Sequence, residues 1–261
     1  MKPVALITGA SAGIGTELAR VFAEHGHDLV LVARRQARLE ALADEIAAHG
    51  RPRPTVLAAD LASPDAIAEI KAALTARDLE PAVVVNNAGF GLFGTATLLD
   101  HGEQLVMIDL NVRALTELSL AFVDSLQRHR GGILNVASVA AFVPGPSMAV
   151  YYASKAYVLS FSEALNRELK DRGIRVTTLC PGPVATEFNE RAGLPGGRGP
   201  EQILSVPADR VARIGYEGFV RGQRVVVAGA GNKVVVFMLR FLPHALVLPI
   251  LDRRMRRMAS T

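Results

Sequence analysis

Cysteine is almost absent from this chain of 261 residues, which contains only Cys180. A single cysteine cannot form a disulfide within the chain, so the sequence suits a reducing, cytoplasmic compartment. Tryptophan is missing altogether, and there are only four tyrosines. The net charge is only +4, and the body of the chain has no basic stripe interleaved with aromatic residues. We therefore expect no nucleic-acid partner.

Long uncharged apolar runs are also missing, since none reaches the roughly 18 residues that a membrane-spanning helix needs. The start, MKPVALITGA, has one lysine and a brief apolar run. It is therefore interpreted as a first strand and not as a signal peptide. Half of the residues are hydrophobic, which is enough for the sizeable core of a soluble globular protein.

Short β-branched runs alternate with helical windows along the chain. The expected strands are residues 4–8, 29–33, 55–59, 83–86, 132–137, 175–180 and 224–228. The expected helices include residues 15–25, 36–49, 63–76, 101–129 and 151–172. Several strands are apolar throughout, as in parallel sheets that are buried on both faces. This order predicts one α/β Rossmann domain, a doubly wound parallel sheet of about seven strands flanked by helices.

A glycine-rich loop, TGASAGIG, follows the first expected strand and opens the first helix. Its Gly9, Gly13 and Gly15 allow a sharp turn and a close approach to a pyrophosphate. The helix N-terminus then offers free N–H groups and the positive end of a dipole. The loop predicts a dinucleotide site, and a tight turn without a ligand is the alternative.

The end of the second strand, LVLVARRQAR, indicates which dinucleotide would bind. Sites for NAD usually carry an acid there, which binds the adenosine ribose. Ala33 stands in that place, followed by Arg34 and Arg35. A guanidinium can bind a 2′-phosphate in bidentate fashion. The pattern favours NADP(H), and a merely solvated helix start is the alternative.

A second group of motifs lies farther along the chain. NNAG follows the fourth strand, Ser138 follows the fifth, and Tyr151 and Lys155 form a YxxxK sequence. Residues at i and i+4 of a helix share one face, so Tyr151 and Lys155 would point into one cleft. An ordinary surface pair is the alternative for these two residues alone. A nearby ammonium is expected to lower the pKa of a phenol, which then exchanges a proton more easily.

Together with TGxxxGxG, these motifs resemble the short-chain dehydrogenase/reductase (SDR) family over residues 1–190. Within the family, these motifs are most similar to those of bacterial ketoacyl reductases and hydroxysteroid dehydrogenases. The resemblance implies an NAD(P)-dependent oxidoreductase that interconverts CH–OH and C=O groups. It assigns Tyr151 as the proton donor, Lys155 as its partner, Ser138 to the substrate oxygen and Asn111 to a proton relay.

The resemblance also implies a set of cofactor-binding residues, in which Asp60 would fix the adenine ring. The residues after the sixth strand would lie beside the nicotinamide. The set is Gly9, Ser11, Gly13, Ile14, Gly15, Arg34, Arg35, Asp60, Leu61, Asn87, Ala88, Gly89, Tyr151, Lys155, Pro181, Gly182, Val184 and Thr186. We expect no metal site.

Two segments leave their roles open. Residues 187–207 are rich in glycine and proline, and would form either a mobile substrate lid or a surface loop. The catalytic domain is expected to span residues 1–232, followed by an apolar and basic extension, residues 233–261. This extension could lie on a membrane surface, pack on a partner subunit or cover the substrate pocket.

The sequence also gives an expectation for the substrate class and for the oligomeric state. Apolar residues near the site loops favour a hydrophobic ketone or acyl substrate; they are Phe90, Leu92, Phe93, Phe142, Pro144 and Met148. SDR proteins are often dimers or tetramers, which implies a homodimer or homotetramer here. A catalytically silent NADPH-binding regulator on the same fold is the competing function.

Overall fold

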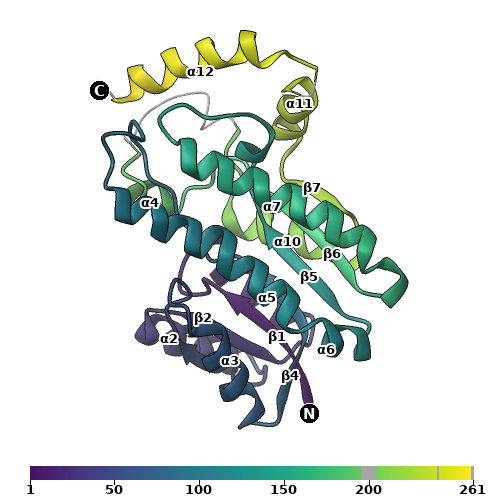
Figure 1. Ribbon diagram of the computed structural model, residues 1–261. Helices are drawn as coiled ribbons and strands as arrows, with labels where there is room; N and C mark the ends of the chain where they lie inside the picture. The colour runs from purple at the N-terminus through teal and green to yellow at the C-terminus, as the bar shows by residue number, and fades with distance from the viewer. Residues whose placement is uncertain (195–203, 240, 260–261) are drawn as a thin grey trace.

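The computed structural model describes residues 1–194, 204–239 and 241–259. Seven parallel strands form one sheet in the order β3-β2-β1-β4-β5-β6-β7, with helices on both faces (Figure 1). The strands are β1 (Lys2–Thr8), β2 (Leu29–Ala33), β3 (Thr55–Ala58), β4 (Leu79–Asn86), β5 (Gly132–Val136), β6 (Arg175–Cys180) and β7 (Val225–Val227). The predicted doubly wound Rossmann fold is confirmed.

Side chains of β1 alternate between the two faces of the sheet. Ala5 and Ile7 join one apolar core with α1 (Gly13–Glu24), α2 (Gln36–Ala48) and α10 (Ala208–Val220). Val4 and Leu6 join the other core with α3 (Ala66–Thr75), α5 (Leu115–Ala121) and α7 (Ala149–Glu168). The strand order reverses between β1 and β4, and in such sheets ligands bind outside the carboxyl ends of the strands at that point.

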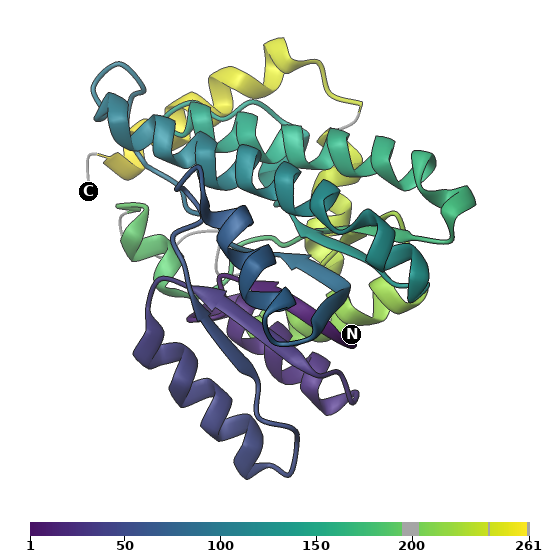
Figure 2. The same ribbon diagram turned by 60° about the horizontal axis from the view of Figure 1, so that its bottom comes forward.

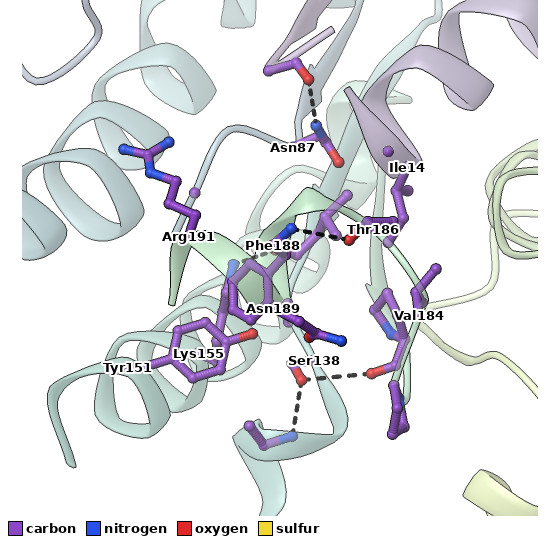
Figure 3. A pocket seen from close by; sticks show the side chains of 18 of the residues that line it. Ile14, Asn87, Ser138, Tyr151, Lys155, Val184, Thr186, Phe188, Asn189 and Arg191 are labelled. Atoms are coloured by element: carbon purple, nitrogen blue, oxygen red, sulfur yellow. Dashed lines mark hydrogen bonds between the residues drawn. The ribbon is translucent and has the colours of Figure 1, made fainter. Parts of the chain in front are cut away.

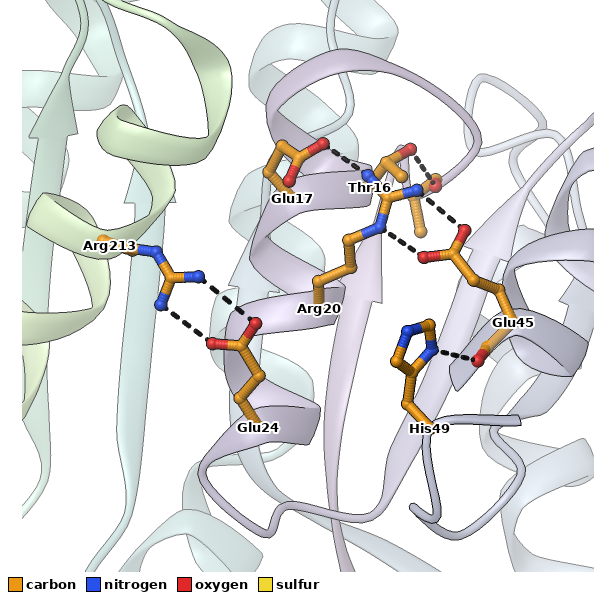
Figure 4. A network of polar contacts seen from close by, with 8 residues as sticks. Thr16, Glu17, Arg20, Glu24, Glu45, His49 and Arg213 are labelled. Carbon is orange, nitrogen blue, oxygen red and sulfur yellow. Dashed lines mark hydrogen bonds and ion pairs between the residues drawn. The ribbon is translucent and has the colours of Figure 1, made fainter. Parts of the chain in front are cut away.

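Ion pairs connect the helices of the first face (Figure 4). Arg20 of α1 forms two hydrogen bonds to the carboxylate of Glu45 on α2, at 2.7 and 2.8 Å. Arg213 of α10 lies 2.8 Å from Glu24 at the end of α1. Exposed pairs of this kind contribute about 0–1 kcal/mol each. Together they join α1, whose first turn belongs to the glycine-rich loop, to α2 and α10.

The helix predicted over residues 101–129 forms with one interruption, at Phe122. The structure divides it into α4 (His101–Ile108), a π-helical turn η1 (Asp109–Ala114), α5 and α6 (Val123–Arg128). Phe122 interrupts the helix with φ −119° and is buried in the second core. The Ser125 hydroxyl then donates a 2.6 Å hydrogen bond to the carbonyl of Pro81. Tertiary burial and anchoring to β4 therefore override the helical periodicity.

The observed C-terminal end of the helix predicted over residues 151–172 lies only a few residues from the predicted end. The helix predicted over 151–172 ends at Glu168 and is followed by a 3-10 turn, η3 (Lys170–Arg172), because Gly173 takes a left-handed φ of +70°. A second 3-10 turn, η2 (Val139–Phe142), follows β5.

The C-terminal part forms two helices, α11 (Ala230–Leu239) and α12 (His244–Ala259). In Figure 1 α12 lies across the end of the molecule opposite to the N-terminus, and Figure 2 shows the same yellow helix from another side. Of the segment expected as a lid or a loop, residues 187–191 form α8 (Glu187–Arg191), and residues 195–203 lie outside the described residues. Within the described ranges, no helix is long and apolar enough to cross a membrane.

Candidate active site

A cleft of about 950 Å³ opens at the carboxyl ends of the strands. A volume of this size lies at the upper end of the range for small-molecule sites. Every residue that the sequence assigned to catalysis or cofactor binding lines this cleft, except Gly15 and Asn111. Those two are buried: Gly15 packs against the Gly9 carbonyl, and Asn111 hydrogen-bonds the backbone of Phe90.

Glycines shape the loop between β1 and α1. Gly9 and Gly13 have φ values of +65° and +56°, which L-residues with a side chain rarely adopt. A Cβ on Gly15 would lie 2.2 Å from the Gly9 carbonyl oxygen. The Asn87 side chain donates hydrogen bonds to the carbonyls of Thr8, at 3.0 Å, and Gly9, at 3.2 Å. The end of β4 thus fixes the loop that would face a pyrophosphate.

Arg34 and Arg35 follow β2, and Arg191 of α8 lies near enough for their charges to act on it. Arg35 donates to the Ser11 carbonyl at 3.1 Å and lies 2.7 Å from Glu187 of α8. Burial lowers the pKa of Arg191, and the charges of Arg34 and Arg35 lower it further. Like charges held close together make this end of the cleft suited to an anion.

Tyr151 and Lys155 lie in the first turns of α7 and face the cleft, close to Ser138 (Figure 3). Both side chains are buried. Burial lowers the pKa of Lys155 to about 8, and its ammonium donates a 2.9 Å hydrogen bond to the Val136 carbonyl. The sequence correctly predicted that helical spacing would direct both side chains into one space.

We expected the Lys155 ammonium to lower the pKa of Tyr151, but in the structure this pKa is raised. Burial raises the pKa of Tyr151 to about 12, and a hydrogen bond with Ser138 acts in the opposite direction. Desolvation disfavours the phenolate more strongly than its neighbours stabilise it. In the free protein Tyr151 is therefore a protonated phenol at neutral pH.

Ser138 caps the 3-10 turn η2 at the end of β5. Its hydroxyl accepts a 3.1 Å hydrogen bond from the Ala140 amide and donates a longer one, 3.5 Å, to the Pro181 carbonyl. These contacts fix the hydroxyl beside Tyr151, where it can also bind a substrate oxygen.

Asn111 lies in the π turn η1, which places its buried side chain behind the cleft. Its amide donates to the Phe90 carbonyl at 2.9 Å and to Ser154 at 3.1 Å, and its oxygen accepts from the Phe90 amide at 3.1 Å. A Cβ on Gly89 would lie 2.9 Å from the Asn111 oxygen and 3.4 Å from the Lys155 nitrogen. A side chain at this position would require Asn111 to move. π turns are frequent at functional sites.

The apolar wall of the cleft differs from the one expected. Met148 lines it, whereas Phe90, Leu92 and Phe93 pack in a cluster around Tyr151, and Pro144 is exposed. Phe142 packs against a separate cluster that includes Val158 of α7.

The wall is completed from the C-terminal part, by Val235, Leu239, Leu251 and Met255. Of the three roles left open for this segment, covering the pocket is the one that the structure shows. Its apolar composition indicated that it would be buried somewhere, but no local signal linked it to the site. Among the described residues, no group of three or more His, Cys, Asp or Glu side chains lies together as a metal site would need.

Comparison with known proteins settles the family. A family model described as short chain dehydrogenase matches residues 3–194. The chain belongs to the short-chain dehydrogenase family. It is therefore an oxidoreductase that acts on alcohol or carbonyl groups.

Three relatives illustrate the range of this SDR protein's neighbours. A sulfoacetaldehyde reductase of Chromohalobacter salexigens is 39% identical over 191 residues, which are 72% of this chain and 75% of that one. The structure of a Sphingobium yanoikuyae short-chain dehydrogenase in complex with NADPH is 34% identical, with a TM-score of 0.77, and covers 99% of this chain and 95% of that one. A bulky-bulky ketone specific alcohol dehydrogenase from Comamonas testosteroni is 30% identical, with a TM-score of 0.75 and 92% of each chain covered.

Proposed function

We propose that this SDR protein reduces an apolar ketone or aldehyde with NADPH, and that Tyr151 donates the proton. The observation that carries the proposal is the meeting of Tyr151, Lys155 and Ser138 in one cleft with the arginines at the end of β2. The relative from Sphingobium yanoikuyae was solved with NADPH bound, which supports the same cofactor here.

The residues present fit a dinucleotide with a 2′-phosphate. Gly9, Gly13 and Gly15 let the loop pack closely on the chain, since a Cβ at any of them would lie 2.2–3.0 Å from another protein atom. No acid stands at Ala33 to repel a phosphate. Arg34 and Arg35 would bind the 2′-phosphate, and the amides at the start of α1 would face the pyrophosphate. When bound, NADPH supplies the hydride.

The chain's own residues supply the rest of the reduction. Ser138 holds the substrate oxygen by a hydrogen bond, and the Tyr151 hydroxyl donates its proton to that oxygen as negative charge develops on it. The Lys155 ammonium then stabilises the phenolate that remains. Asn111 hydrogen-bonds the Phe90 backbone and Ser154 of α7, which joins the segment after β4 to the helix that carries Tyr151 and Lys155.

The substrate end of the cleft supports an apolar substrate. Val143, Met148, Phe188, Leu251 and Met255 contribute to its lining. Burial of a large apolar substituent there would be driven by the removal of its surface from water. The Comamonas testosteroni relative is named for bulky ketones, whereas the sulfoacetaldehyde reductase is named for a small polar aldehyde.

The decisive test compares Tyr151→Phe with Tyr152→Phe. Oxidation of NADPH and NADH would be followed with a panel of ketones, aldehydes, β-ketoacyl thioesters and steroids. We expect wild-type turnover with NADPH on an apolar class. Tyr151→Phe should keep its NADPH affinity and lose at least about 100-fold in turnover, while Tyr152→Phe keeps most of it. NADPH binding without turnover on any compound would favour the silent regulator.

The arginines need a separate test. Arg34→Asp should weaken NADPH binding relative to NADH, because it removes a partner of the 2′-phosphate and adds a repelling charge. An unchanged ratio of the two dissociation constants would contradict the NADPH assignment.

We further propose that the protein forms a homodimer or homotetramer through α4, α5 and α7. Leu105 and Ile108 of α4, Leu120 of α5 and Tyr157 of α7 are large side chains that are at least 40% exposed. Light scattering over a range of protein concentrations measures the assembly, and a monomer at all concentrations would contradict it.

The outer face of the C-terminal helices supports a contact with an anionic lipid surface. Its large apolar side chains are 42–72% exposed; they are Val234, Phe237, Met238, Phe241, Leu242, Leu246 and Ile250. Exposed arginines follow at the end of α12, including Arg253 and Arg257. An apolar face beside arginines complements the acyl chains and charged headgroups of a membrane interface.

A further inference from the structure

Glu187, the first residue of α8, connects this short helix to the arginines at the end of β2. Its carboxylate lies 2.7 Å from Arg35 and 3.6 Å from Arg38. The hydrogen bond from Arg35 holds the pKa of Glu187 below its usual value, so the carboxylate is charged at neutral pH. Arg35 also donates to the Ser11 carbonyl in the glycine-rich loop. The start of α8 is thus tied to the place where a 2′-phosphate would bind.

The next residue, Phe188, connects the same helix to the proton donor. Its ring centre lies 5.3 Å from that of Tyr151, and Figure 3 shows the two rings side by side in the pocket. A Cβ on Gly91 would lie 2.9 Å from the tip of the Phe188 ring, so the ring is closely packed. Phe188 therefore packs against the Tyr151 ring and lines the cleft that a substrate must enter.

Adjacent residues of one short helix thus contact the two ends of the cleft. Thr186 caps α8 and accepts a hydrogen bond from the Phe188 amide, which joins the two contacts in one turn of backbone. A change in the Glu187 contact is transmitted to Phe188 through this single turn.

We propose that Glu187 is a latch that couples recognition of the 2′-phosphate to the opening of the substrate end. The proposal rests on the proposed NADPH preference. A phosphate and a carboxylate compete for the same guanidinium fork, and their like charges disfavour their joint presence. When the phosphate takes Arg35, Glu187 is released, α8 loses its anchor and Phe188 moves off Tyr151. The neutral 2′-hydroxyl of NADH leaves the Arg35–Glu187 pair in place.

Cofactor affinities test the competition directly, without turnover. The dissociation constants of NADPH and NADH would be measured by quenching of nicotinamide fluorescence for wild type, Glu187→Gln and Glu190→Gln. Glu190 is exposed and lies on the same short helix, so its variant removes an equal charge nearby. The pair is exposed, so Glu187→Gln should tighten NADPH binding by about two- to fivefold. NADH binding should change less than twofold, and Glu190→Gln should alter neither.

Hydrogen exchange of the α8 amides tests the transmission to Phe188. In the wild type, saturating NADPH should speed exchange over residues 186–194, whereas NADH should not. In Glu187→Gln the exchange should be fast before any cofactor is added. A normal fold of this variant is established by an unchanged exchange pattern over β1–β6.

The outcomes separate the latch from the cofactor assignment. If wild type prefers NADPH but Glu187→Gln leaves the ratio of dissociation constants and the α8 exchange unchanged, the latch is overturned and the assignment stands. If wild type binds NADPH no tighter than NADH, both are overturned.

Discussion

The Lys155 ammonium lies 5.9 Å from the centre of the Tyr151 ring, and both side chains are buried at the foot of the cleft. Burial acts on them in opposite directions. It lowers the pKa of Lys155 to about 8 and raises that of Tyr151 to about 12. Burial disfavours the charged form of both groups, so a proton that moves between Tyr151 and a substrate changes the charge of a buried site.

Lys155→Met should stabilise the fold while it removes turnover. A lysine pKa lowered from 10.5 to about 8 corresponds to a charge-burial cost of about 3 kcal/mol. Loss of the hydrogen bond to Val136 offsets part of the gain, so we expect the free energy of unfolding at pH 7 to rise by about 1–2 kcal/mol. Urea denaturation measures it. A clear loss of stability would mean that the charge is compensated by contacts that burial alone does not describe.

The pH dependence of this stability has a definite sign. The pKa of Lys155 is lower in the folded state than in the unfolded state, so the folded state binds fewer protons between about pH 8 and 10.5. The Lys155 contribution to the free energy of unfolding should therefore rise with pH in this window. The difference between wild type and Lys155→Met, measured from pH 7 to 10.5, isolates it. A difference that stays constant would place the lysine pKa near its ordinary value.

Carbonyl reduction should lose rate above about pH 8. Tyr151, with a pKa of about 12, stays protonated over the accessible range, whereas Lys155 loses its charge as the pH passes about 8. A neutral amine stabilises the phenolate less. The value of kcat/KM at limiting substrate, measured from pH 6 to 10, should be level and then fall. A profile that rises above pH 8 would argue against the ammonium as the stabilising group.

Gly15→Ala should disrupt the glycine-rich loop. The new Cβ would lie 2.2 Å from the Gly9 carbonyl oxygen and 2.4 Å from the Asn87 amide nitrogen. Since one of these is backbone, the loop itself must shift, at a stability cost of about 1–3 kcal/mol. NADPH affinity should fall at least about tenfold, as titration would show. In Gly102→Ala the nearest atom is the Asp100 side-chain oxygen at 3.2 Å, and we expect wild-type affinity.

Met255→Ala should widen the range of ketones accepted. Met255 of α12 is 8% exposed and packs with Phe90, Met148 and Tyr151. Its truncation enlarges the substrate end, so kcat/KM should rise for ketones with larger substituents and change little for small ones. Leu246→Ala is the matched control, because Leu246 is 61% exposed on the same helix. If both variants leave the order of substrates unchanged, α12 does not set specificity.

Vesicle flotation tests the lipid contact of the outer C-terminal face. Full-length protein should float with anionic vesicles and much less with neutral ones. The double variant Phe237→Asp and Phe241→Asp should remain at the bottom, because both rings are exposed and touch each other. Val220→Asp replaces a half-exposed side chain at the end of α10 and should float like wild type. Equal flotation of all forms, or none for wild type, would overturn the proposal.

Features that depend on a few neighbouring residues could be predicted from the sequence. The spacing of Tyr151 and Lys155 places them on one helix face, and Gly9 and Gly13 mark backbone that needs a positive φ. The Arg35–Glu187 pair could not be anticipated, because its residues lie 152 positions apart. The break at Phe122 and the raised pKa of Tyr151 depend on tertiary burial, which no short window of sequence encodes.

The catalytic side chains and the glycine-rich loop lie within residues 3–194, the stretch that the family model matches, whereas part of the cleft wall comes from α11 and α12 beyond it. The residues proposed for proton transfer and part of the substrate wall are thus encoded in separate lengths of chain. In the proposed reductase, mutations confined to α11 and α12 would change which substrates fit and would leave Tyr151 in place. Sequence changes in α11 and α12 would therefore be enough to vary the substrates of such a protein.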